Sequence, residues 1–278
     1  MRVGFAFANA MANAEPAMAV EFAQAAESAG FESLWTVEHV LVPADYESTY
    51  PYNRRGRMAG PEDQAMPDPI VWLTHVAAHT ERIMLGTGIV ILPLRRPPVL
   101  AKQAASLQVI SGGRFLLGVG AGWLQEEFDA IDVPFEDRGD RTDDHIQALR
   151  ALWEQELATF HGTHTRFEDV YSRPRPPSPI PIVIGGHSKR AARRAGELGD
   201  GFFPGRVIED ELQGLLDRVR ETAEAAGRDP DGIEITLGAR PDPEQIEERF
   251  AAGADRVVVP SQIGVDGVEM LGKALGLA

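Results

Sequence analysis

An acid and a base stand side by side at Glu38 and His39, directly after the apolar run 33–37. Histidine exchanges a proton near neutral pH, and a carboxylate next to it can orient the imidazole or hydrogen-bond a cofactor ring. A histidine that is merely satisfied within a loop fits the same spacing. His39 and Glu38 are therefore the candidate catalytic residues, and the spacing alone leaves both interpretations open.

A candidate anion site follows the β-rich run 182–185 at Gly185, Gly186, His187 and Ser188. Free N–H groups at a helix start, the helix dipole, a hydroxyl and freely oriented glycine backbone together suit a phosphate. Ser188 would also fit a plain helix cap. Four basic residues follow, which favour an anion site but also fit a solvated helix face: Lys189, Arg190, Arg193 and Arg194.

Glycines also crowd the end of the apolar run 115–120, just before Ala121, Gly122 and Trp123. The segment is not a dinucleotide-binding fingerprint, because the GxGxxG spacing fails at Trp123. Small residues at the end of a strand let a flat ring system approach the backbone closely. A tight turn is the alternative explanation for these glycines.

The remaining polar motifs carry less information. His75 and His79 have the i, i+4 spacing that can bind a metal, but the glutamate of HExxH and a third ligand are missing, so we expect no metal site. The basic run 53–57 is typical of a solvated loop, and at a barrel mouth it would instead contact the carboxylates or phosphate of an anionic ligand.

The elements that must position these residues alternate between β-rich runs and helical patterns, the order of a parallel sheet with crossover helices. The predicted strands are 3–7, 33–37, 83–92, 115–120, 182–185, 201–204, 233–238 and 256–260. The predicted helices are 16–29, 68–80, 98–110, 142–156, 188–198, 210–226, 243–252 and 268–275. This count, in 278 residues, favours a closed (β/α)8 TIM barrel in a single domain, 1–278, over an open doubly wound sheet.

Three segments are longer than ordinary connections: 40–67 after the second strand, 121–141 after the fourth and 158–181 before the fifth. The first two leave the C-terminal ends of strands, where barrel enzymes build their active sites. We expect these two inserts to bound the principal pocket. The third insert is typical of a short hairpin followed by a proline-stiffened linker.

The composition argues against several classes of function. Lys+Arg 27 against Asp+Glu 42 gives a net charge of −15, which disfavours nucleic acid and anionic lipid surfaces as partners. The absence of cysteine excludes disulfides and thiolate sites. No export signal and no apolar run of about 20 residues is visible, so we expect a cytoplasmic protein without a membrane partner.

Four segments, in the same order, resemble luciferase-like monooxygenases, particularly their coenzyme F420-dependent branch. They are SLWTVEHV at 33–40, ERIMLGTG at 81–88, SGGRFLLGVG at 111–120 and IGGHS at 184–188, and the similarity spans essentially the whole chain. The resemblance implies a TIM barrel with the tricyclic cofactor ring across its mouth and a phosphate-bearing tail at the loop after strand five.

Carried over by motif, the resemblance implies several contacts to the cofactor. Glu38 and His39 would face the ring, and a strand bulge, often with a cis peptide bond in this family, would lie behind it at Gly88 and Ile89. The full set of implied cofactor-binding residues is Ala6, Glu38, His39, Gly88, Ile89, Ala121, Gly122, Gly185, Gly186, His187 and Ser188.

The chain departs from the deazaflavin dehydrogenases of this family at Trp123, where they tend to carry an acidic catalytic residue. The departure leaves proton donation to His39 and disfavours a sugar-phosphate substrate. With Trp72 and Tyr52 as expected neighbours, Trp123 predicts an apolar wall for the substrate.

The predicted function is therefore an F420-dependent oxidoreductase that moves a hydride between the cofactor and a small, partly apolar organic substrate, with His39 as proton donor or acceptor. We expect it to be a homodimer. Two alternatives stay open: an FMNH2-dependent monooxygenase with FMN as cofactor, and a protein that binds a flavin or deazaflavin without turnover.

Overall fold

The computed structural model describes residues 1–205 and 209–277. Within them, eight parallel strands pair in the order β3-β2-β1-β11-β10-β9-β8-β5, and β5 pairs back with β3, which closes the barrel. The strands are β1 (Val3–Ala6), β2 (Ser33–Thr36), β3 (Met84–Thr87), β5 (Phe115–Gly120), β8 (Ile182–Gly185), β9 (Gly201–Phe203), β10 (Glu234–Gly238) and β11 (Arg256–Pro260). The predicted TIM barrel is confirmed.

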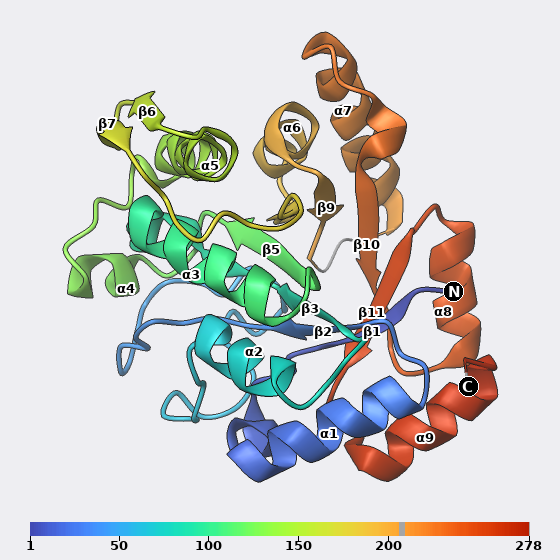
Figure 1. Ribbon diagram of the computed structural model, residues 1–278. Helices are drawn as coiled ribbons and strands as arrows, with labels where there is room; N and C mark the ends of the chain where they lie inside the picture. The colour runs from blue at the N-terminus through green and yellow to red at the C-terminus, as the bar shows by residue number, and fades with distance from the viewer. Residues whose placement is uncertain (206–208, 278) are drawn as a thin grey trace.

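Helices surround the strands, and α1 lies beside α9 at the C-terminal end of the chain (Figure 1). The ring of helices consists of α1 (Pro16–Ser28), α2 (Pro69–Ala77), α3 (Pro97–Ile110), α5 (Arg138–Glu154), α6 (Lys189–Leu198), α7 (Glu209–Ala225), α8 (Pro243–Ala251) and α9 (Gly264–Leu275). In the two described ranges, every helix is too short or too polar to cross a membrane.

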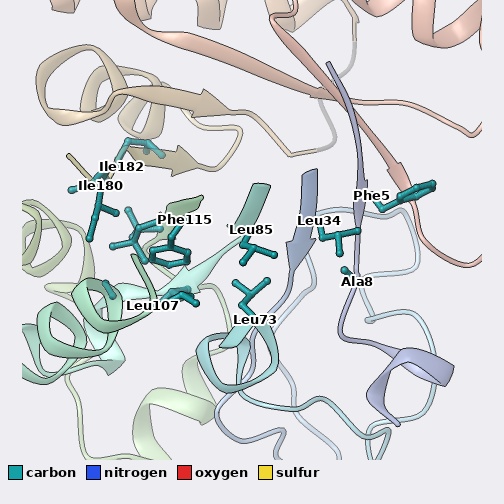
Figure 2. Close-up of a cluster of buried hydrophobic side chains, with 14 of the residues drawn as sticks. Phe5, Ala8, Leu34, Leu73, Leu85, Leu107, Phe115, Ile180 and Ile182 are labelled. Carbon is teal, nitrogen blue, oxygen red and sulfur yellow. The ribbon is translucent and has the colours of Figure 1, made fainter. Parts of the chain in front are cut away.

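Alternate residues of each strand enter two separate apolar layers, as the period of two in a strand requires. Leu34, Leu85 and Phe115 point outward and pack under the helices, where Figure 2 shows Leu85 directed toward Leu73 of α2. The barrel interior is filled instead by Trp35, packed with Leu116, Val183 and Val258. A Cβ atom at Gly86 would lie 2.6 Å from the ring of Trp35, so this glycine leaves the space that the indole fills.

A buried arginine closes the N-terminal end of the barrel. Arg256, at the start of β11, donates to both carboxylate oxygens of Glu32 at 2.8 Å and to Glu234 at 3.2 Å. Its guanidinium carbon lies 5.4 Å from the centroid of the Trp35 ring. All three guanidinium nitrogens therefore have partners at this end of the barrel.

The predicted strand 83–92 is divided in the structure. β3 ends at Thr87, a cis peptide bond joins Gly88 to Ile89, and the short strand β4 (Val90–Ile91) resumes the pairing with β5 before the 3₁₀ helix η2 (Leu92–Leu94). The cis bond at the predicted position is confirmed. The apolar run gave no sign of the division, because all of these residues are buried or nearly buried on either side of the bulge.

The insert 121–141 contains helical residues that were not predicted. Within 121–141 a short helix, α4 (Gln125–Ala130), was not predicted, and α5 begins at Arg138 rather than at residue 142. Both segments are polar at their starts, so they lack the apolar periodicity on which the prediction depended. The predicted hairpin is confirmed as β6 (Ala158–His161) and β7 (Arg166–Val170), which pair antiparallel.

Candidate active site

His39 follows β2 at the C-terminal end of the barrel and is held by a carboxylate from α4. Its Nδ1 lies 2.8 Å from Oε2 of Glu127. The other oxygen of Glu127 accepts hydrogen bonds from the backbone amides of Val40 at 2.6 Å and Leu41 at 3.2 Å. The Glu127 side chain is fully buried, and that of His39 is 8% exposed. Sequence reasoning missed Glu127, because nothing in the pattern links it to a histidine 88 residues earlier.

The carboxylate of Glu38 binds Arg95 and the amide of Ile91, not His39. Its buried carboxylate forms an ion pair with Arg95 and accepts a hydrogen bond from the amide of Ile91 at 2.5 Å. Arg95 also binds Asp68 at 2.6 Å. Burial raises the pKa of the Glu38 carboxyl, against the opposing effect of Arg95. The expectation that Glu38 orients His39 is therefore wrong, because its side chain ties β2 to β4 instead.

Three of the predicted cofactor segments meet around the side chain of Ile89. A Cβ atom at Gly185 would lie 2.4 Å from Cγ2 of Ile89, and one at Gly120 would lie 2.9 Å from its Cδ1. The bulge in the third barrel strand thus packs on the ends of β5 and β8 only because glycine occupies those positions. Ala6, at the end of β1, packs on the apolar cluster inside the barrel.

The local backbone and packing explain why residue 122 is glycine. It has a φ of +80°, and a Cβ atom there would lie 2.7 Å from the ring of Phe128 in α4. Glycine at this position therefore permits both the turn and the close packing of α4. Its contact with a cofactor, and that of Ala121, stays a prediction.

The predicted anion site forms the turn from β8 into α6. Ser188 is the N-cap of α6, and its hydroxyl oxygen accepts a hydrogen bond from the amide of Ala191 at 3.1 Å. Gly186 has a φ of +124° and donates its amide to the carbonyl of Phe203 at 3.2 Å. Nδ1 of His187 is buried, and the described residues give it no hydrogen-bond partner. An oxygen-rich ligand would supply one.

The basic residues of α6 divide into two pairs. Arg194 is buried and forms an ion pair with Asp143 of α5, and Arg193 binds Asp143 at 3.2 Å and Glu197 at 2.8 Å. These two arginines join α6 to α5. Lys189 and Arg190 make up the second pair and, together with Arg193, border a cavity of about 370 Å³ between α6 and α7.

A chain of aromatic rings connects His39 with His187. The ring of Trp123 lies 5.7 Å from that of His39 and 5.2 Å from that of Tyr50. Tyr50 lies 5.3 Å from Tyr52, which lies 5.1 Å from His187. Burial, with a further contribution from Tyr52 and Tyr46, raises the pKa of Tyr50 to about 12, so its hydroxyl is neutral. The insert 40–67 therefore reaches from the histidine of β2 to the turn before α6.

Of the two residues expected beside Trp123, Tyr52 belongs to the same group of aromatic rings and Trp72 does not. Tyr52 reaches Trp123 through Tyr50, and Tyr46 lies 5.5 Å from Trp123. Trp72 is not a member of the wall: it is buried in the outer apolar layer, and its Nε1 donates to the carbonyl of Asn13 at 2.8 Å. Its position on α2 faces the strands, so the indole packs in the core.

The two inserts are joined at the barrel mouth. Glu126 of α4 accepts hydrogen bonds from the amides of Glu47 at 2.6 Å and Ser48 at 2.9 Å. A cavity of about 450 Å³ opens inside the first insert, lined by residues 45–49 and 53–57. It lies within the first insert, whereas the principal pocket was expected between the two inserts. In the basic run 53–57, Arg57 stacks on Tyr46, 4.3 Å from the ring centroid.

His75 in α2 and His79, just after its end, both contact backbone carbonyls. Nε2 of His75 lies 3.3 Å from the carbonyl of Pro16, and Nδ1 of His79 lies 2.9 Å from the carbonyl of His75. Among residues 1–205 and 209–277, no three metal-ligating side chains gather in one place.

Comparison of the sequence with known proteins identifies its family. The sequence profile of luciferase-like monooxygenases matches residues 1–259. An uncharacterised protein of Mycobacterium tuberculosis is 34% identical over 209 residues, which make up 75% of this chain and 72% of the relative. An F420-dependent glucose-6-phosphate dehydrogenase of Kineococcus radiotolerans is 31% identical over 228 residues, 80% of this chain and 63% of that protein.

A solved structure supports the fold. An F420-dependent secondary alcohol dehydrogenase, in complex with an F420-acetone adduct, superposes with a TM-score of 0.80 over 99% of this chain and 98% of its own, at 19% identity. At that identity the likeness shows the barrel architecture alone. Together with the profile match over residues 1–259, it means that this chain belongs to the luciferase-like monooxygenase family.

Proposed function

We propose that the protein is an F420-dependent oxidoreductase acting on a small, partly apolar organic substrate. One observation carries the proposal: the aromatic chain through Trp123, Tyr50 and Tyr52 joins the proton-transfer candidate His39 to the turn at His187. A ligand with a redox ring and a phosphate-bearing tail needs such a mouth, with a proton-transfer group at one end and a helix start at the other.

The residues present fit a deazaflavin. The buried, unpartnered Nδ1 of His187 and the free amides at the start of α6 suit an oxygen-rich tail. The glycines at the ends of β5 and β8 let the side chain of Ile89 pack on those strand ends, where it would lie behind the cofactor ring. Gly185, Gly186, His187 and Ser188 would hold the phosphate, and Ala6, Glu38, His39, Gly88, Ile89, Ala121 and Gly122 would surround the ring.

When bound, F420 exchanges a hydride with a substrate carbon. His39 would exchange the proton that must accompany that hydride at the substrate oxygen. Trp123 and Tyr50 would exclude water and supply an apolar surface to the substrate. A small alcohol or ketone with an apolar substituent fits the aromatic rings beside His39.

The cofactor distinguishes this proposal from an FMNH2-dependent monooxygenase. The names of two compared proteins, an F420-dependent dehydrogenase at 31% identity and another of the same fold, support F420. The reaction is tested by mixing the protein with oxidised F420 and a panel of small secondary alcohols, without oxygen, and following the loss of the absorbance of oxidised F420.

We expect alcohol-dependent reduction of F420 under these conditions. Turnover that instead requires FMNH2 and oxygen would support the monooxygenase. Binding of F420 without turnover across alcohols, ketones and their reverse reactions would support a cofactor-binding protein and overturn the proposal.

A further inference from the structure

We infer that Glu127 is a positioning residue that selects which nitrogen of His39 takes part in proton transfer. The role of His39 in proton transfer rests on the proposed function. The position of the proton on its ring does not. Its basis is a single buried carboxylate that binds one imidazole nitrogen and two backbone amides.

The two oxygens of Glu127 have separate partners. Oε1 accepts the amides of Val40 and Leu41, at 2.6 and 3.2 Å, and Oε2 lies 2.8 Å from Nδ1 of His39. A carboxylate can only accept hydrogen bonds, so Nδ1 must carry a proton. The Glu127 side chain is fully buried, so water does not substitute for it. The carboxylate thus fixes the proton of the neutral ring on Nδ1.

The lone pair of the neutral imidazole then lies on Nε2. In the part of the chain that the structure describes, Nε2 has no hydrogen-bond partner, and it is not one of the buried unpartnered atoms. It therefore opens to the mouth, beside the ring of Trp123. As a substrate alcohol is oxidised, its hydroxyl proton passes to Nε2, and the charge of the resulting imidazolium is balanced by Glu127. In the reverse direction the same proton returns to the oxygen of the ketone.

Because Val40 and Leu41 donate to Glu127, one substitution tests whether Glu127 fixes the tautomer of His39. In Glu127→Gln, the amide side chain has a single oxygen, and the two backbone donors require it. The NH₂ group must then face His39, where it can only donate, so Nδ1 becomes an acceptor and the proton moves to Nε2. The ring would keep its place but present the wrong nitrogen, as an aspartate-to-asparagine change does in a serine protease.

The chain offers a matched control in the neighbouring Glu126. It lies on the same helix and also accepts two amides of the first insert, those of Glu47 and Ser48, but it does not contact His39. Glu126→Gln therefore changes the same chemical group and disturbs the same insert. It should leave the tautomer of His39 as in the wild type.

The experiment is ¹⁵N NMR of the histidine side chains in the cofactor-free protein, with the His39 signals assigned by their absence in His39→Ala. We expect the proton of His39 on Nδ1 in the wild type and in the control Glu126→Gln. In Glu127→Gln we expect it on Nε2. With F420 and a substrate, Glu127→Gln should lower turnover by roughly 10²–10⁴-fold.

A neutral wild-type His39 with its proton on Nε2 would overturn the inference without any variant. An unchanged tautomer in Glu127→Gln, or the same shift in Glu126→Gln, would also overturn it. Because the tautomer is read without cofactor, these results stay separate from a failure of the protein to reduce F420, which would count against the proposed function alone.

Discussion

The two ends of the barrel use buried carboxylates in contrasting ways. At the N-terminal end, every guanidinium nitrogen of Arg256 donates a hydrogen bond, to Glu32, Glu234 or Thr236. At the C-terminal end, Glu127 engages one nitrogen of His39 and leaves the other open. A saturated network can only hold the barrel together, whereas an incomplete one offers a group to a ligand. The difference indicates that substitutions at the first end should change stability and those at the second should change chemistry.

The largest expected effect lies at the open nitrogen. His39→Ala should lower F420-dependent turnover by roughly 10²–10⁴-fold, the usual cost of losing a general acid or base, while cofactor affinity stays within a few-fold. Steady-state kinetics and a binding titration separate these quantities. His161→Ala, in the exposed hairpin, is the control and should keep wild-type turnover. Unchanged turnover in His39→Ala would assign this histidine to structure and remove the contrast between the two ends.

The next effect concerns affinity at the turn before α6. Ser188→Asp keeps an N-cap acceptor for the amide of Ala191, so the melting temperature should stay near that of the wild type. The new carboxylate would repel a phosphate at short range, which should weaken the binding of F420 by roughly 10²-fold. Ser188→Asn, an uncharged cap, is the matched control. Equal binding by both variants would mean that Ser188 only caps the helix.

A third effect should appear in stability and not in chemistry. Arg256→Met leaves Glu32 without its cation and Glu234 with Arg2 alone at the closed end of the barrel, which should lower the free energy of unfolding by about 2–3 kcal/mol. Urea unfolding measures the loss. Arg220→Met, which breaks an exposed pair with Asp231, should cost less than about 0.5 kcal/mol. A variant of Arg256 that unfolds like the wild type but turns over slowly would reverse our assignment of the two ends.

The smallest effect depends on pH and on the contact between the inserts. Burial opposes the charge of Glu126, but hydrogen bonds from Ser48 and Glu47 outweigh it and lower the pKa from 4.5 to about 2. The ionised group therefore stabilises the folded state above pH 4.5, and this contribution is lost as the pH falls toward 2. The difference in unfolding free energy between wild type and Glu126→Gln should shrink below pH 4.5. A difference that is constant down to the lowest pH with a folded protein would contradict this.

The barrel could be predicted because its signals are local. Most strands are continuous apolar runs with a helical pattern after them, and Ser188 could be recognised as a helix cap from its position. The break at Gly88 could not be found from the run itself and came only from the family resemblance. Within the run, the residues on both sides of the break are buried or nearly buried.

The site was less accessible to sequence reasoning because its contacts join distant segments. Glu38 and His39 are neighbours in the chain, yet their side chains bind Arg95 and Glu127 on separate elements. Trp72 and Trp123 are equally aromatic, and only the packing of α2 shows that the first belongs to the core. Pairings between residues 57 and 88 positions apart depend on the closed barrel, which no local pattern contains.

The central claim is that one mouth, between His39 and the turn at Ser188, binds a deazaflavin. The most direct measurement is a fluorescence-quenching titration of the purified wild-type protein with F420 and, separately, with FMN. We expect saturable binding of F420 at one site per chain, and tighter binding of F420 than of FMN. Saturable binding of FMN with no binding of F420 would contradict the claim.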